Sequence, residues 1–212
     1  MFKKNLWRAG APVLCVSLIA ALTPAAAFAS PARVSVTANA TDKAFVREMV
    51  PHHQMAKEMA GMALMGAGHP QIKTLAKNII SAQTAEITRL RKIARSIGVT
   101  PEKMSMGGKM TDQMMKDLET LRVSMSRSSM NMDMSELEGA KPFDRKFIDM
   151  MIAHHAGAIL MARAEISRGA NPTLRSIATG IIGDQAKEIR EMNSWRVKWY
   201  GKASPAGGVP GS

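Results

Sequence analysis

The sequence contains very little cysteine and few aromatic residues. Among its 212 residues there is one Cys, and aromatic side chains make up 4%. One Cys cannot close an intrachain disulfide or supply a cysteine-rich zinc site. So few aromatics argue against a surface that stacks single-stranded nucleic acid. Methionine, in contrast, is abundant with 19 residues, and the formal net charge is +12.

The N-terminal segment predicts export. A basic start is followed by an apolar run over 11–22 and by small residues at 27–29, which is the pattern of a secretory signal peptide. The apolar run is shorter than the roughly 20 residues of a membrane span. We therefore expect a signal peptide over 1–29, a periplasmic protein and no membrane span. Because the protein is exported and its charges are spread along helices, we expect no nucleic-acid partner.

The chain repeats itself. Residues 45–97 align without a gap with residues 147–199, at a constant offset of 102. The most distinctive matches are His52-His53 with His154-His155, Gln83 with Gln185, and Glu86 with Glu188. Agreement between residue types this different indicates an internal duplication.

Each copy has the periodicity of two long helices. Apolar residues recur at steps of three and four, and glycine and proline punctuate the middle of each copy. The sequence thus predicts an all-α fold, a four-helix bundle made of two duplicated hairpins. The expected organisation is a flexible segment over 30–40, a bundle domain over 41–200 and a disordered tail over 201–212. The bundle domain consists of repeat one (41–98), a Met-rich connection (99–141) with a short helix near its middle, and repeat two (142–200).

Polar residues interrupt the apolar seams at matching heights. His52 lies about as far before the first hairpin turn as Gln83 and Glu86 lie after it, and the second copy has the same spacing. We therefore expect His52, His154, Glu86 and Glu188 to meet in one buried layer, flanked by His53 and His155. Duplicated His pairs favour a metal site over hydrogen-bonded structure. Gln83, Glu86, Gln185 and Glu188 either ligate the metal or orient the imidazoles.

Methionine is also concentrated where a core is not expected. Most Met at helical spacing packs into cores. The polar connection, however, contains Met104, Met106, Met130, Met132 and Met134, which we expect to lie outside the core. Thioethers are soft, uncharged ligands that suit Cu(I) and Ag(I) better than zinc or iron. We predict that these residues capture copper.

The string FVREMVPHHQMAKEMA, repeated as FIDMMIAHHAGAILMA, resembles the CopM-like family of exported, Met-rich proteins. The resemblance extends over about residues 41–200. It implies a ferritin-like four-helix bundle, a role in copper resistance, and copper ligation by the His pairs and by Met. On this sequence the matching residues are His52, His53, His154, His155, Met59 and Met161, with Met49 and Met151 also inside the motif.

We therefore expect a protein without catalytic activity that sequesters or transfers copper, with silver as a second cargo and a copper efflux or chaperone protein as partner. Two alternatives remain. A ferritin-like di-iron oxidase would need Glu-x-x-His motifs, and neither His pair has Glu at that spacing. A metal-free adaptor bundle is the third reading. The sequence leaves the oligomeric state open.

Overall fold

The computed structural model describes residues 37–101 and 111–211, and these form helices and loops without any β-strand. This confirms the all-α prediction. The expected signal peptide, most of the segment 30–40, and Met104 and Met106 lie outside the described residues. The helices are α1 (Ala40–Gly66), α2 (Pro70–Ser96), α3 (Asp112–Leu121), α4 (Met125–Ser128), α5 (Ser135–Glu138), α6 (Phe143–Arg168) and α7 (Pro172–Tyr200).

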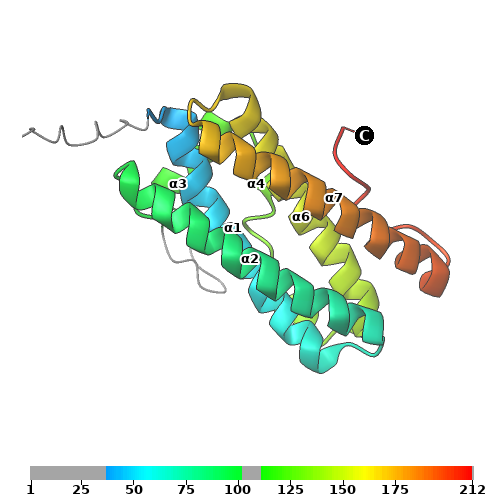
Figure 1. Ribbon diagram of the computed structural model, residues 1–212. Coiled ribbons are helices and arrows are strands. Elements are labelled where there is room, and N and C mark those ends of the chain that lie inside the picture. The colour runs from blue at the N-terminus through cyan, green and yellow to red at the C-terminus, as the bar shows by residue number, and fades with distance from the viewer. Residues whose placement is uncertain (1–36, 102–110, 212) are drawn as a thin grey trace, which may run out of the picture. The chain divides into compact units, whose positions relative to one another are not determined.

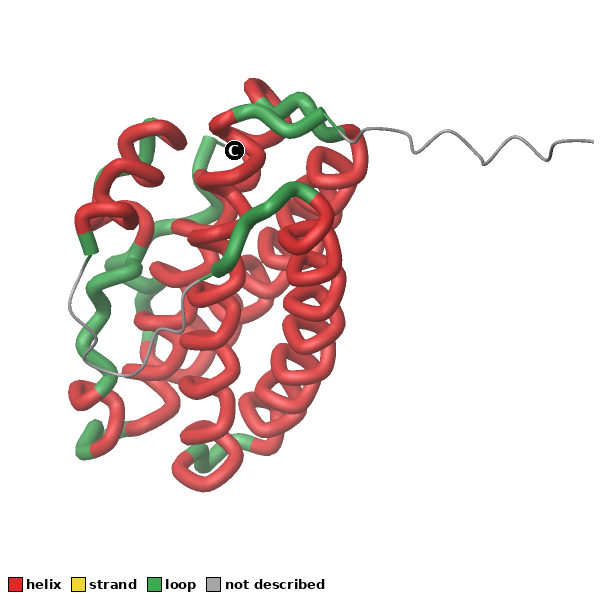
Figure 2. The backbone as a smooth tube through the Cα atoms, turned by 90° about the vertical axis from the view of Figure 1, so that its left-hand side faces the viewer, coloured by secondary structure: helices red, strands yellow, loops and turns green. Residues whose placement is uncertain are grey.

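Four long helices form the bundle, as two antiparallel hairpins (Figure 1). Helix α1 packs against α2, α6 packs against α7, and the two hairpins meet along α1 and α6. Figure 2 shows the long helices side by side, with the shorter helices of the connection on the outside. Helix α3 contacts α1, and α4 contacts α6. None of the described helices is long and apolar enough to cross a membrane.

Local sequence signals set the ends of these helices. Asn39 caps α1 in a capping box with Asp42, and Asn171 caps α7 through its side chain. Proline occupies the first position of both α2 and α7, where its missing N–H costs nothing. After α7, Gly201 adopts a φ of 76°, a left-handed conformation that glycine tolerates.

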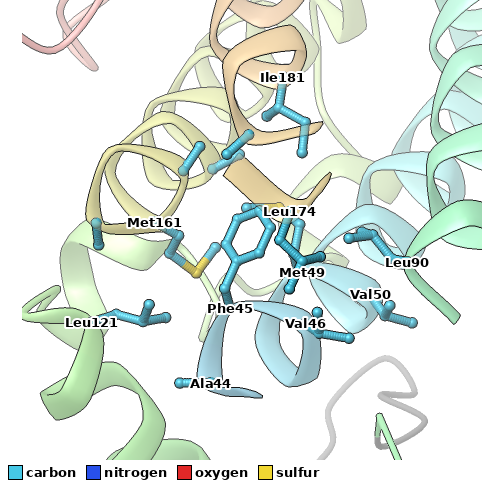
Figure 3. Close-up of a cluster of buried hydrophobic side chains, with 14 of the residues drawn as sticks. Ala44, Phe45, Val46, Met49, Val50, Leu90, Leu121, Met161, Leu174 and Ile181 are labelled. Atoms are coloured by element: carbon cyan, nitrogen blue, oxygen red, sulfur yellow. The ribbon is translucent and has the colours of Figure 1, made fainter. Parts of the chain in front are cut away.

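The apolar core consists of two clusters, and residues of one cluster have their counterparts from the other repeat in the second cluster. One cluster contains Met49 of α1 and Met161 of α6, shown with Phe45 and Leu174 in Figure 3. The other contains their counterparts at the offset of 102, namely Met151 and Met59. All four methionines are fully buried. The two hairpins are therefore related by a pseudo-twofold axis that passes between the clusters.

Two aspartates connect the ends of the two hairpins by hydrogen bonds. Asp42 and Asp144, which correspond at the offset of 102, each lie in the first turn of a hairpin and accept hydrogen bonds from the turn of the opposite hairpin. The donors are the backbone N–H groups of Ala170 and Asn171 for Asp42, and of Gly68 and His69 for Asp144, at 2.8–3.0 Å. These bonds satisfy backbone groups that the bundle buries.

The described part of the connection after residue 110 is more helical and more buried than expected. Besides the expected short helix it forms α4 and α5. Met130 and Met134 are only 2% and 4% exposed and belong to the two apolar clusters, and Met132 packs partly buried against the second. The expectation that Met130 and Met134 lie outside the core is wrong, because the connection crosses the bundle surface and turns these side chains inward.

The tail also differs from the expectation of disorder. Residues 201–211 fold back along α7, where the Ser204 N–H donates to Asn193 and the Asn193 amide donates to the Gly207 carbonyl. Ser204 is 5% exposed. Glycines permit this reversal of the chain, and the side chain of Asn193 holds it in place.

One buried carboxyl breaks the symmetry at the Asp42 end. Glu165 is fully buried beside Asp42, whereas its counterpart in the first copy is Ala63. Burial, and then the Asp42 carboxylate, raise the pKa of Glu165 to about 9. Although burial acts against it, backbone hydrogen bonds from Asn39 and Asn171 lower the pKa of Asp42. Near neutral pH, Glu165 is therefore protonated in the folded protein.

This arrangement predicts that the protein loses stability as the pH rises. Between the ordinary glutamate pKa and about 9, the native state holds a proton on Glu165 that the unfolded chain releases. The free energy of unfolding should fall by up to about 1.4 kcal/mol per pH unit from this group. In Glu165→Gln that slope should disappear in urea titrations from pH 6 to 8. The exposed Glu191→Gln is the control, and equal slopes in all three proteins would contradict the assignment.

Candidate metal centre

A layer of polar side chains separates the two apolar clusters. It contains His52 and His53 of α1, His154 and His155 of α6, Gln83 and Glu86 of α2, and Gln185 and Glu188 of α7. All four imidazoles are fully buried. Burying this much polar surface between apolar clusters is unfavourable unless the groups find partners or a ligand.

The rings of His52 and His154 contact each other at the centre of the layer. Their centroids are 3.7 Å apart and their planes are tilted by 34°. The two residues correspond at the offset of 102, so the pseudo-twofold axis passes between them. The expectation that these two residues meet is confirmed by this geometry.

The glutamates bind the outer histidines. Glu86 lies 2.7 Å from Nε2 of His53, and Glu188 lies 2.6 Å from Nε2 of His155. Glu86 lies in the same layer as His52 but does not bind it, because His52 faces the opposite hairpin. His53, one position further around α1, faces α2 of its own hairpin.

The hydrogen bonds leave one nitrogen unpaired on each of three rings. A carboxylate accepts from the Nε2–H of His53 and of His155, and the Nδ1 of each ring has no partner. His52 has the same pattern, with Nε2 3.1 Å from the backbone carbonyl of Ser128 and Nδ1 unpaired. An acceptor that fixes one ring N–H leaves the other nitrogen with a free lone pair, the usual arrangement of metal-ligating histidine.

His154 is the exception, because neither of its ring nitrogens has a hydrogen-bond partner. Burial holds the pKa of His154 well below its usual value, and the neighbouring imidazoles of His52, His155 and His53 lower it further. The same causes, burial first and then His53 and His155, lower the pKa of His52. Both central imidazoles are therefore neutral at pH 7, the state in which a ring nitrogen can bind a metal.

The glutamines add further unsatisfied atoms. Gln83 and Gln185 are each 3% exposed. The amide oxygen of Gln83, and both amide atoms of Gln185, lack a hydrogen-bond partner. Unsatisfied buried polar groups are rare in native proteins and usually have a functional explanation. Their concentration in one layer fits a bound ion.

The layer is not a ready-made site for a hard metal. Within residues 37–101 and 111–211, no three His, Cys, Asp or Glu residues are grouped so that they could hold a metal ion. The additional donors next to the central pair are thioethers, since Met49 and Met151 precede His52 and His154 by one helical turn. Met59 and Met161 lie two turns beyond the pair. Two neutral imidazoles with nearby thioethers form a soft donor set.

Two residues of the site were not anticipated from the sequence. Ser128 and Gly157, which bring the carbonyl to His52, give no recognisable motif. Outside the layer, His69 takes the N-cap position of α2, but its side chain makes no capping hydrogen bond. Its Nδ1 lies 2.5 Å from Asp144, and its ring stacks on Trp199.

Comparison with known proteins assigns the chain to a family. Residues 42–196 match the family described as a domain of unknown function, DUF305. The chain belongs to the DUF305 family. The crystal structures of CopM in Cu(I)-bound and Cu(II)-bound forms are 33% and 35% identical to this chain, with TM-scores of 0.60 and 0.61. The Cu(I) form aligns with 76% of this chain and 98% of CopM, and the Cu(II) form with 75% and 97%.

More distant relatives share the fold or a fragment. A DUF305 protein from Streptomyces coelicolor is 20% identical with a TM-score of 0.64, and the alignment covers 77% of this chain and 96% of that one. Uncharacterized protein L153 of Acanthamoeba polyphaga mimivirus is 41% identical over 51 residues, which make up 24% of this chain and 34% of that protein. The chain thus matches only about a third of the length of this viral relative.

The observed pairing makes a specific energetic prediction. Since Glu86 binds His53, the effects of His53→Ala and Glu86→Ala on the free energy of unfolding should be strongly non-additive. The expected coupling is on the order of 0.5–3 kcal/mol, because either single change leaves the other buried group unpaired. The cycle of His52→Ala with Glu86→Ala should give a smaller coupling. Urea denaturation measures both cycles, and a larger coupling of Glu86 with His52 than with His53 would contradict the observed pairing.

Proposed function

We propose that this protein is an exported copper-binding protein that holds Cu(I) in the polar layer and sequesters it or passes it on. The observation that carries the proposal is the contacting pair of neutral, buried imidazoles, His52 and His154, with unpaired ring nitrogens. A cation bound there would accept the lone pairs of ring nitrogens that have no hydrogen-bond partner in the protein.

The chemistry of the donors favours a soft ion. Cu(I) and Ag(I) accept imidazole and thioether ligands and tolerate low coordination numbers, whereas magnesium prefers oxygen ligands and non-haem iron sites combine imidazole with carboxylate. Neither ligand type needs to lose a proton, so binding of a monovalent ion adds only one positive charge to the layer. Silver is therefore the expected second cargo.

The comparisons support the same reading. CopM, which matches over most of its length, has been crystallised with Cu(I), Cu(II) and silver bound. The basic and apolar N-terminal residues 1–29 support export, and the absence of Cys after that segment suits an oxidising compartment where thioethers replace thiolates. A role in copper tolerance, with a copper efflux or chaperone protein as recipient, follows from such a location.

The two alternatives fit the layer less well. A di-iron oxidase needs carboxylates facing the metals from several helices. Here Glu86 and Glu188 are each engaged by the Nε2 of a histidine. A metal-free adaptor would not explain why so many buried polar atoms of the layer lack hydrogen-bond partners. We therefore propose binding without catalysis.

The proposal predicts that the mature protein retains Cu(I) against a colorimetric chelator and binds Fe(II) poorly. The double variant His52→Asn/His154→Asn should lose at least about tenfold in Cu(I) affinity, since a site reduced by two ligands loses most of its binding energy. His69→Asn, which changes a half-exposed imidazole into the residue found in the second copy, is the matched control. Met49→Leu and Met151→Leu keep the core volume and measure the thioether contribution.

Two results would overturn the proposal. One is oxygen consumption on adding Fe(II), together with no retention of Cu(I) by the wild type. The other is equal Cu(I) affinity in the wild type and the double histidine variant, which would place the metal elsewhere on the chain.

A further inference from the structure

We infer that the backbone carbonyl of Ser128 positions His52 for metal binding, by holding its proton on Nε2 and directing the Nδ1 lone pair toward the ion. This inference rests on the proposed function. It assigns a role to the connection between the repeats, which the duplication by itself does not require.

Three of the four imidazoles share one pattern of hydrogen bonds. His53 and His155 each present Nε2 to a glutamate carboxylate and keep Nδ1 unpaired. His52 also has an oxygen acceptor at Nε2 and an unpaired Nδ1, but its acceptor is the Ser128 carbonyl. The carbonyl thus occupies the place that Glu86 and Glu188 take for the outer histidines. An oxygen acceptor at one nitrogen fixes the tautomer and so selects the nitrogen that can coordinate.

The fold is built to bring this carbonyl inward. Helix α4 packs directly on α6, and a Cβ at position 157 would overlap the carbonyl of Ser128. Gly157 is therefore the residue that permits the approach, and the corresponding residue of the first copy is Met55. The Ser129 hydroxyl donates to the Ala153 carbonyl at 2.9 Å and anchors the segment to α6.

Backbone conformation also marks the segment. Arg122 and Ser129, on either side of α4, have φ values of 54° and 58°. Residues other than glycine rarely adopt this left-handed conformation, and they persist in it where the surrounding structure holds them. Here the Ser129 hydrogen bond to α6 and the burial of Met130 in the first apolar cluster hold the segment against His52.

The consequence is that the two central imidazoles are not equivalent. The pseudo-twofold axis relates His52 to His154, but within the described residues of the connection an acceptor is found for His52 and none for His154. His154 has no hydrogen-bond partner at either nitrogen. His52 is thus the preorganised ligand of the pair, and His154 is free to choose its tautomer when the ion binds.

The test is the tautomer of His52 in the metal-free protein, read from the ¹⁵N chemical shifts of the imidazoles. In the wild type, His52 should carry its proton on Nε2, as should His53 and His155. In Gly157→Ala, which pushes the Ser128 carbonyl away, His52 should become a mixture of tautomers while His53 and His155 stay unchanged. Affinity for Ag(I) should fall by about tenfold, the lower end of the effect of removing an orienting partner.

Gly61→Ala is the control, since a Cβ at this position in α1 meets nothing within 4 Å. Ser129→Ala, which removes only the anchor to α6, is the second variant if Gly157→Ala does not fold. A wild-type His52 protonated on Nδ1, or an unchanged tautomer and Ag(I) affinity in the variants, would overturn the inference. Failure of the wild type to bind Ag(I) would instead refute the proposed function, and the metal-free tautomers would still report the Ser128 contact.

Discussion

The bundle is organised around four imidazoles that are buried with too few protein partners. Each long helix contributes to the layer that contains them, and the apolar residues form separate clusters on either side of it. Buried polar groups without partners destabilise a fold, so a layer retained in both copies points to a ligand that completes it. In our account that ligand is a soft monovalent cation, and the neighbouring methionines extend the soft surroundings into both clusters.

The duplication explains most of this arrangement, and the connection explains the rest. The pseudo-twofold axis brings His52 against His154 and lets Asp42 and Asp144 each hold the turn of the opposite hairpin. The connection has no counterpart in the repeat, and its Ser128 carbonyl gives one of two otherwise equivalent imidazoles a fixed orientation. In our account, the symmetric helices supply the proposed metal ligands, and the asymmetric connection makes the two central histidines different.

Helical periodicity and the offset of 102 were sufficient to predict the four long helices, their turns and the His layer. They could not predict which histidine Glu86 binds, because two adjacent residues on a helix differ only in direction. They also misplaced Met130 and Met134, since polar neighbours in sequence do not reveal that a segment crosses an apolar surface. Asp42 and Asp144 occupy matching positions in the two repeats, but the sequence did not reveal that each binds the turn of the opposite hairpin. Acidic residues near the start of a helix usually indicate only a favourable interaction with the helix N-terminus.

The most direct test of the central claim is a crystal structure of the mature protein loaded with Ag(I), with the ion located by its anomalous scattering. Our account predicts an anomalous peak within bonding distance of a ring nitrogen of both His52 and His154, with a methionine sulfur as an additional ligand. Anomalous peaks confined to exposed methionines, with the histidine layer unchanged and empty, would contradict it.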